Sequence, residues 1–147
     1  MLEVSHIHKT YNPGTVREKT LFQDFSLSIP DGQFVSVVGS NGSGKTSLLN
    51  ILCGSIPVEQ GKILMDNADI TKVKEFRRYR RMGRVYQNPA MGTCPTMNIL
   101  ENLSMADNKG KPFNLTRGTN KRRIEAYKAM LAPLGLGLED KMGIPVG

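Results

Sequence analysis

Apolar and polar residues alternate over the first part of the chain, which is typical of β-strands with one buried face. Residues 2–8 (LEVSHIH) and 21–29 (LFQDFSLSI) both show this alternation, and the Asn-Pro-Gly turn signal between them predicts a connecting loop. Residues 33–39 (QFVSVVG) differ because they are almost continuously apolar and rich in valine. Such a run predicts a strand buried on both faces of a parallel sheet.

Further along the chain the spacing changes to that of helices. Residues 45–52 (KTSLLNIL) place leucine and isoleucine at helical spacing, and the Cys-Gly-Ser that follows predicts the end of that helix. A short hairpin is predicted around Asp66 and Asn67, and residues 83–87 (GRVYQ) predict a short strand. Further helices are predicted over residues 74–82, 95–106 and 120–131, the last with Asn120 as its N-cap.

The composition is that of a soluble globular protein. The chain has 147 residues, of which 39% are hydrophobic and 22% charged, and no apolar run approaches the roughly 18–20 residues needed to span a bilayer. The N-terminal MLEVSHIHKT lacks the basic segment and apolar core of a secretory signal. Cys53 and Cys94 fit no metal-binding spacing and indicate a reducing compartment. A cytoplasmic location is therefore expected.

The formal net charge of +7 is concentrated in two basic stretches. The charged residues are Lys72, Lys74, Arg77, Arg78, Arg80, Arg81 and Arg84 in the first, and Lys109, Lys111, Arg117, Lys121, Arg122 and Arg123 in the second. A basic surface can attract nucleic acid, anionic lipid or nucleotide, but most such stretches are solvated surface segments. No aromatic residues are interleaved as in single-strand binding proteins, so a nucleic-acid partner is not expected.

The strongest chemical signal is residues 39–46 (GSNGSGKT), which match the phosphate-binding pattern G-x-x-x-x-G-K-[ST] in full. The context also fits this P-loop pattern, since a predicted buried strand precedes it and a helix follows it. Glycines let the backbone turn its N–H groups toward phosphate oxygens, and the positive end of the helix dipole lies at the same place. Lys45 is expected to reach the β- and γ-phosphates, and the Thr46 hydroxyl to bind Mg²⁺.

The longer stretch VVGSNGSGKTSLLNILCG closely resembles the P-loop of ABC transporter ATPases, and the resemblance covers the whole chain. In that family an aromatic residue near the end of the first strand stacks on adenine, and Tyr11 occupies this place. Residues 83–89 (GRVYQNP) resemble the family's Q-loop, which implies a catalytic and Mg²⁺-binding role for Gln87. The resemblance assigns nucleotide binding to Tyr11, Gly39, Ser40, Asn41, Gly42, Ser43, Gly44, Lys45, Thr46 and Ser47.

The fold that this resemblance implies is α/β, with a P-loop NTPase core, a small antiparallel β subdomain and the start of a helical subdomain. The expected β subdomain comprises residues 1–32 and 61–72, and the expected P-loop core comprises residues 33–60 and 73–88. Residues 89–147 are expected to form the start of the helical subdomain. The family's L-S-G-G-Q signature and Walker B strand are not found, which implies the N-terminal half of an ABC ATPase domain, inactive alone. The ILMD at residues 63–66 looks like a Walker B strand but is expected to belong to the hairpin.

The implied function is ATP binding and hydrolysis that drives solute transport across a membrane, with ATP and Mg²⁺ as cofactors. The implied partners are transmembrane permease subunits and a second, identical ATP-binding subunit, at the cytoplasmic face of the plasma membrane. Within the family the sequence looks most like bacterial importers that use an extracytoplasmic substrate-binding protein, of an uncharacterised amino-acid-type branch. In such importers the substrate is chosen by other subunits.

Two other classes of P-loop protein remain as alternatives. A soluble ABC-type ATPase that acts in translation or DNA repair is consistent with the basic stretches, although no coiled-coil or zinc insertion follows Gln87. A GTPase should show the base-reading motif N-K-x-D, and the sequence contains none. The predicted function is therefore a transport ATPase.

Overall fold

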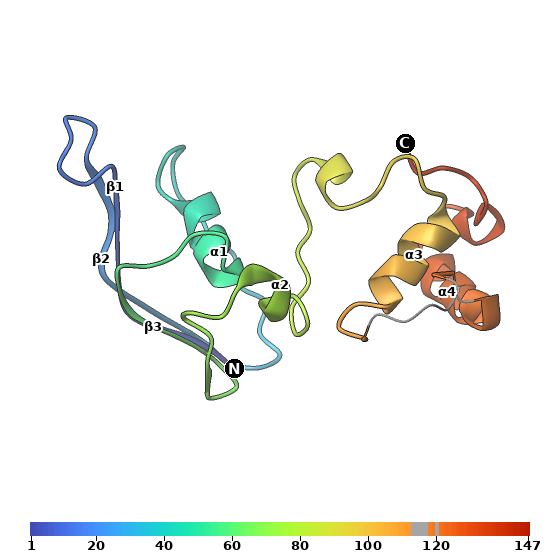
Figure 1. The fold of residues 1–147 in the computed structure, drawn as a ribbon, viewed down its shortest axis with the longest axis horizontal. Coiled ribbons are helices and arrows are strands. Elements are labelled where there is room, and N and C mark those ends of the chain that lie inside the picture. The colour runs from blue at the N-terminus through green and yellow to red at the C-terminus, as the bar shows by residue number, and fades with distance from the viewer. Residues whose placement is uncertain (113–117, 120) are drawn as a thin grey trace. The chain divides into compact units, whose positions relative to one another are not determined.

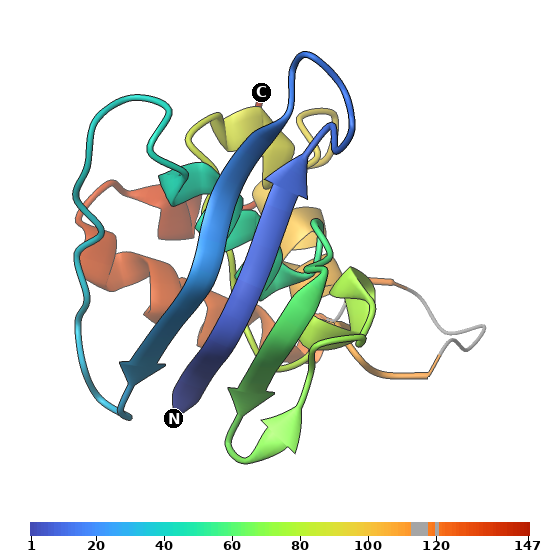
Figure 2. The same cartoon turned by 90° about the vertical axis from the view of Figure 1, so that its left-hand side faces the viewer.

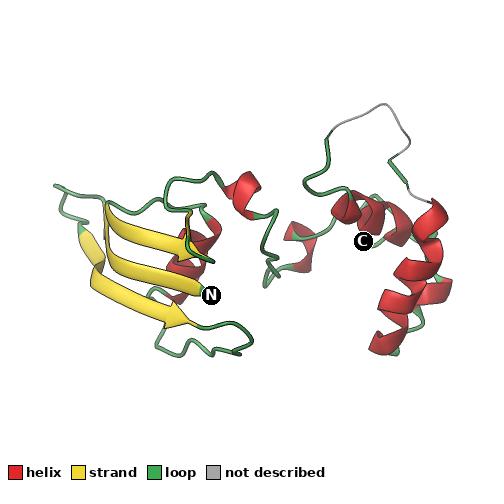
Figure 3. Cartoon of the chain, turned by 90° about the horizontal axis from the view of Figure 1, so that it is seen from below, coloured by secondary structure: helices red, strands yellow, loops and turns green. Residues whose placement is uncertain are grey.

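A computed structural model of the chain describes residues 1–112, 118–119 and 121–147. Two units are distinguished, Met1–Met82 and Gly83–Gly147. All four described strands and helices α1 and α2 belong to the first unit, whereas the second contains helices α3 and α4 (Figures 1 and 3). The expected N-cap Asn120, and Arg117 of the second basic stretch, lie outside the described residues.

The first unit is built on an antiparallel sheet with the strand order β2-β1-β3-β4 (Figure 2). Its strands are β1 (Leu2–Tyr11), β2 (Lys19–Ile29), β3 (Gln60–Met65) and β4 (Ala68–Asp69). The strands predicted near the N-terminus are both present and longer than expected. The predicted hairpin is β3–β4, and its two turn residues Asp66 and Asn67 have φ of 48° and 63°. Positive φ at both central residues is what two-residue hairpin turns favour.

An irregularity in β1 brings two residues three positions apart to the same buried face. Strict alternation would put Val4 and Ile7 on opposite faces of the sheet, yet both are buried. The register of β1 against β2 shifts between them, and the intervening His6 has φ of 50°. This β-bulge changes the parity of the strand. Asp24 on β2 also has positive φ, and its Oδ1 lies 2.5 Å from His6 Nδ1.

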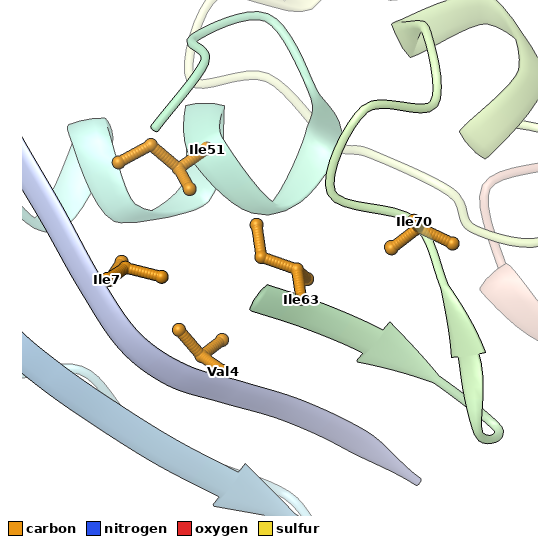
Figure 4. Packing of buried hydrophobic residues seen from close by; sticks show 5 residues of the cluster. All are labelled: Val4, Ile7, Ile51, Ile63 and Ile70. Carbon is orange, nitrogen blue, oxygen red and sulfur yellow. The ribbon is translucent and has the colours of Figure 1, made fainter. Parts of the chain in front are cut away.

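The core of the first unit lies between the sheet and helix α1 (Lys45–Cys53). The helix lies across the sheet and contributes Ile51, which is fully buried (Figure 4). The core residues, from strands β1 and β3, helix α1 and the turn after β4, are Val4, Ile7, Ile51, Ile63 and Ile70. The predicted helix over residues 45–52 is therefore confirmed, and it ends at Gly54 in the left-handed conformation that helix ends favour.

A buried arginine ties helix α2 (Glu75–Arg78) to the C-terminal end of α1. Arg78 is only 5% exposed, although the stretch that contains it was expected to be solvated. Its guanidinium donates at 2.8–2.9 Å to the carbonyl oxygens of Ile51, Leu52, Thr71 and Val73. Burial lowers the pKa of Arg78, but arginine stays protonated because its ordinary pKa is so high.

The second unit is organised by helices α3 (Ile99–Asp107) and α4 (Ile124–Leu131). Helix α3 begins after Asn98 rather than at the predicted Pro95. The reason is a capping box, in which Asn98 Oδ1 accepts from the Glu101 N–H at 2.8 Å and Glu101 Oε2 accepts from the Asn98 N–H at 2.9 Å. Four short 3₁₀ turns complete the described elements, at Pro89–Met91, Lys121–Arg123, Ala132–Leu134 and Leu138–Asp140.

Asp107, at the end of α3, joins the two helices. Its carboxylate accepts hydrogen bonds from Arg123 Nη1 at 2.6 Å, from the Tyr127 hydroxyl at 3.2 Å and from Lys111 Nζ at 3.3 Å. Desolvation alone would raise the pKa of Asp107, but these hydrogen bonds and the neighbouring positive charges outweigh it and lower the pKa. The buried ring of Tyr127 is thereby fixed between α4 and α3.

The strands predicted over residues 33–39 and 83–87 are not formed. Both segments are extended loop, and the exposed fractions of Phe34, Val38 and Val85 are 95%, 91% and 98%. A parallel strand buried on both faces needs a hydrogen-bonded neighbour strand and covering layers. Among the described residues, neither segment has such a neighbour. The two predicted strands are therefore wrong, because the described part of the chain offers neither segment a strand with which to pair.

We expect Arg78→Met to lower the free energy of unfolding by about 2–4 kcal/mol, because the carbonyls that Arg78 satisfies lose a charged donor. The measurement is urea unfolding followed by circular dichroism. Arg77→Met is the matched control, since Arg77 is exposed and its replacement should change stability by less than about 0.5 kcal/mol. Equal stability of the two variants would contradict the structural role of Arg78.

Candidate nucleotide-binding site

The P-loop connects residues 33–38 to the start of helix α1. It turns through a hydrogen bond from the Ser43 N–H to the Ser40 carbonyl at 3.2 Å. Gly44 then enters the helix with φ of 96°, and a Cβ placed there would lie 2.8 Å from Leu21 Cδ1 on β2. The left-handed backbone favours glycine at this position, and a larger residue would also displace the end of the Leu21 side chain.

The ammonium group of Lys45 lies within the curve of the loop. Its Nζ donates to the Gly39 carbonyl at 2.6 Å and to the Ser40 carbonyl at 2.8 Å, and it lies 3.5 Å from Ser43 Oγ. These contacts use the three donor hydrogens of one ammonium. The lysine of the motif therefore lies at the loop for which the sequence predicts phosphate binding, and it also holds the loop closed.

A second cation reaches the same loop from the sheet. Lys19, at the start of β2, donates from Nζ to the Gly42 carbonyl at 3.3 Å. The first turn of α1 contains no acidic residue that would offset this charge. Lys19 is not among the site residues predicted from the sequence. Its only signal is its place at the beginning of β2, where it pairs in register with Tyr11.

Tyr11, the candidate adenine-stacking residue, lies at the end of β1 and contacts α1. Its hydroxyl donates to Ser47 Oγ at 3.3 Å, and its ring is partly exposed. Two residues from separate parts of the sequence, both assigned to nucleotide binding, are thus brought together beside the P-loop helix. Lys9 Nζ lies over the Tyr11 ring at 5.5 Å from its centroid.

The remaining candidate residues are exposed. Asn41 and Thr46 are exposed at the loop and the first turn of α1. Gln87 belongs to the second unit and is exposed there. Over the described part of the chain, no group of three or more His, Cys, Asp or Glu residues could hold a metal ion alone. The Thr46 hydroxyl fits a Mg²⁺ that is held largely by phosphate oxygens and water.

Comparison with known proteins identifies the family to which this site belongs. The family described as ABC transporter matches residues 22–142, which include the whole P-loop and Gln87. The chain belongs to the ABC transporter family. Among the relatives of this ABC chain is a tyrosine transport ATP-binding protein of Clostridioides difficile, 38% identical over 99% of the chain and 58% of the relative. Another is the ABC transporter ATP-binding protein YxdL of Bacillus subtilis, 36% identical over 92% of the chain and 51% of the relative.

Solved structures confirm the predicted α/β ABC ATPase fold. An ATP-binding cassette of an ABC transporter in its ADP conformation superposes with a TM-score of 0.76 at 22% identity, over 100% of this chain and 57% of the other. A dimeric cassette in a post-hydrolysis state bound to ADP and Pi has a TM-score of 0.72 at 24% identity, over 99% of this chain and 62% of the other. The chain thus spans between 51% and 62% of the length of these four proteins.

Among the described helices, none is long and apolar enough to cross a membrane.

We expect Lys45→Ala to weaken ATP binding by about 100-fold or more, because it removes charge-assisted hydrogen bonds to phosphate. The measurement is titration of a fluorescent ATP analogue against purified protein. Lys62→Ala on β3 is the matched control, since it removes the same charge from an exposed position away from the loop. Equal affinities of Lys45→Ala and the wild type would refute the assignment of the loop.

Proposed function

We propose that this chain is the ATP-binding part of an ABC transporter ATPase subunit, which couples ATP binding and hydrolysis to solute transport. The observation that carries the proposal is the complete P-loop at the start of α1, with the ammonium of Lys45 inside it. A curved glycine-rich loop, a helix N-terminus and a lysine form the combination that binds the phosphates of a nucleoside triphosphate.

The proposed division of labour follows from where each group lies. Lys45 binds the β- and γ-phosphates, and the backbone N–H groups of residues 39–46 bind the phosphate oxygens. Mg²⁺, when bound, neutralises phosphate charge, with the Thr46 hydroxyl as a proposed protein ligand. The catalytic and Mg²⁺-binding role that the resemblance implies for Gln87 stays a prediction. Tyr11 stacks on the adenine ring, and its bond to Ser47 keeps it beside the helix that starts at the P-loop.

The proposed partners are those of a transport ATPase. They are transmembrane permease subunits, a second copy of the ATP-binding subunit and an extracytoplasmic substrate-binding protein, with the ATPase at the cytoplasmic face of the plasma membrane. The tyrosine transport relative supports transport of an amino-acid-type solute, and the dimeric solved cassette supports a second ATPase subunit. The names of the relatives are those of transport proteins, which favours transport over a soluble role in translation or DNA repair.

We expect Tyr11→Ala to weaken ATP binding by about 1–3 kcal/mol while inorganic tripolyphosphate binds nearly as before, because only base stacking is lost. Isothermal titration of both ligands against both proteins measures this difference. Tripolyphosphate serves as the internal control, since it contacts the loop and not the ring. If both ligands weaken alike, Tyr11 is a structural residue and the adenine role is wrong.

We also expect a polypeptide of residues 1–147 to release phosphate from Mg-ATP at no useful rate. Hydrolysis needs a group that orients or activates the attacking water, for which the family uses a carboxylate at the end of a Walker B strand. The sequence of residues 1–147 contains neither that strand nor the L-S-G-G-Q signature. The assay compares this polypeptide with a longer one that carries both motifs. Clear turnover by residues 1–147 that is lost in Lys45→Ala would show that these residues suffice for catalysis.

A further inference from the structure

Lys9 holds a largely buried ammonium group beside the Tyr11 ring. Only 13% of its side chain is exposed, and its Nζ lies 2.6 Å from Glu59 Oε1. The same Nζ lies 5.5 Å from the centroid of the Tyr11 ring. Removing an ammonium from water is costly unless it is paired. The carboxylate on one side and the ring on the other therefore define where this ammonium sits.

Glu59 in turn is fastened to the last residues of β1, although it lies in the segment just before β3. Its second carboxylate oxygen, Oε2, accepts from the Thr10 N–H at 2.8 Å. Its own N–H donates to the His8 carbonyl at 3.0 Å. Both carboxylate oxygens of Glu59 and its backbone amide are thus used on β1, immediately before Tyr11.

These contacts occur where the sheet itself is irregular. The register of β1 against β2 shifts between Ile7 and Lys9 and again between Lys9 and Thr10. On the other side of β1, the pairing with β3 shifts before its final pair, which joins His8 to Gln60. Regular strand pairing alone therefore does not determine the backbone that leads to Tyr11, and the carboxylate of Glu59 supplies a fixed contact there.

We infer that the Lys9–Glu59 ion pair orients the Tyr11 ring for nucleotide, with the ammonium on one face of the ring and adenine stacked on the opposite face. This inference rests on the proposed ATP-binding function. The ring is held at its hydroxyl by Ser47 and at its face by Lys9. Lys9 is then a positioning residue, which acts on the base through Tyr11 and not on the phosphates.

Three possible roles of Lys9 predict different changes in the affinities for ATP and tripolyphosphate when Lys9 is replaced. If Lys9 only stabilised the sheet, its loss would lower the unfolding temperature but leave the ratio of ATP to tripolyphosphate affinity unchanged. If it attracted anions through its charge, both ligands would weaken alike. If Lys9 acts through the Tyr11 ring, its loss weakens the binding of ATP but not that of tripolyphosphate, because tripolyphosphate carries no base.

The experiment is isothermal titration of ATP and of inorganic tripolyphosphate against the wild type, Lys9→Met, Lys9→Arg, Glu59→Gln and the control Lys62→Met, with unfolding temperatures measured in parallel. We expect Lys9→Met to weaken ATP about threefold to tenfold and tripolyphosphate by less than about twofold, as for the loss of one ammonium–ring contact. Glu59→Gln should shift the ratio in the same direction, and Lys9→Arg should restore it, because arginine also pairs with carboxylate and stacks on rings. Lys62→Met should change neither ligand.

A double variant decides between coupling and coincidence. In a Tyr11→Ala background, Lys9→Met should cause no further loss of ATP affinity, since the ring through which Lys9 acts is gone. Additive losses, or an unchanged ligand ratio in Lys9→Met, would overturn the inference while leaving the proposed function intact. If Lys9→Met does not fold, Glu59→Gln decides on the same ratio. A wild type that binds neither ligand would overturn the proposed function, and this inference with it.

Discussion

The burial of Ile51 against the sheet residues Val4, Ile7 and Ile63 holds helix α1 across the antiparallel sheet, and the P-loop is continuous with the N-terminal end of that helix. The orientation of α1 therefore determines where the loop lies. Its C-terminal end is held as well, because Arg78 donates to the last carbonyls of the helix. Hydrophobic contact fixes the middle of α1, and buried hydrogen bonds fix its end. With the middle and the C-terminal end of α1 held in this way, the glycine-rich turn at its N-terminal end is the part that is open to a ligand.

The charges around that turn suit an anionic ligand. A lysine in the first helical turn interacts unfavourably with the helix dipole, and no acidic residue accompanies Lys45 there. Lys19 adds a second positive charge from β2. Two cations and a helix N-terminus at one loop weaken an isolated helix, but all three attract phosphate. Helix stability and phosphate binding thus favour opposite charges at the start of α1, and the residues present there are those that favour phosphate binding.

Local patterns predicted the local features of the fold, whereas contacts between distant residues could not be predicted. Alternation and turn residues identified the strands, and a contiguous motif identified the phosphate loop at residues 39–46. The bulge at His6 was missed, because no residue type requires it, although it brings Ile7 into the core. The Lys9–Glu59 pair joins residues 50 positions apart. Arg78 belongs to a basic stretch that appeared uniformly solvated, and only its distant carbonyl partners show that it is buried.

The unpaired state of residues 33–38 gives Lys45 a structural role in addition to the proposed phosphate binding. No strand pairing fixes the backbone before the loop in the described residues, so the bonds from Lys45 to the Gly39 and Ser40 carbonyls hold that side of the turn. A polyphosphate must compete with these carbonyls for the ammonium. The contact with Ser43 Oγ at 3.5 Å is the weakest of the three and the easiest to exchange. The same lysine can then keep the loop closed through Gly39 while it turns one donor hydrogen toward phosphate.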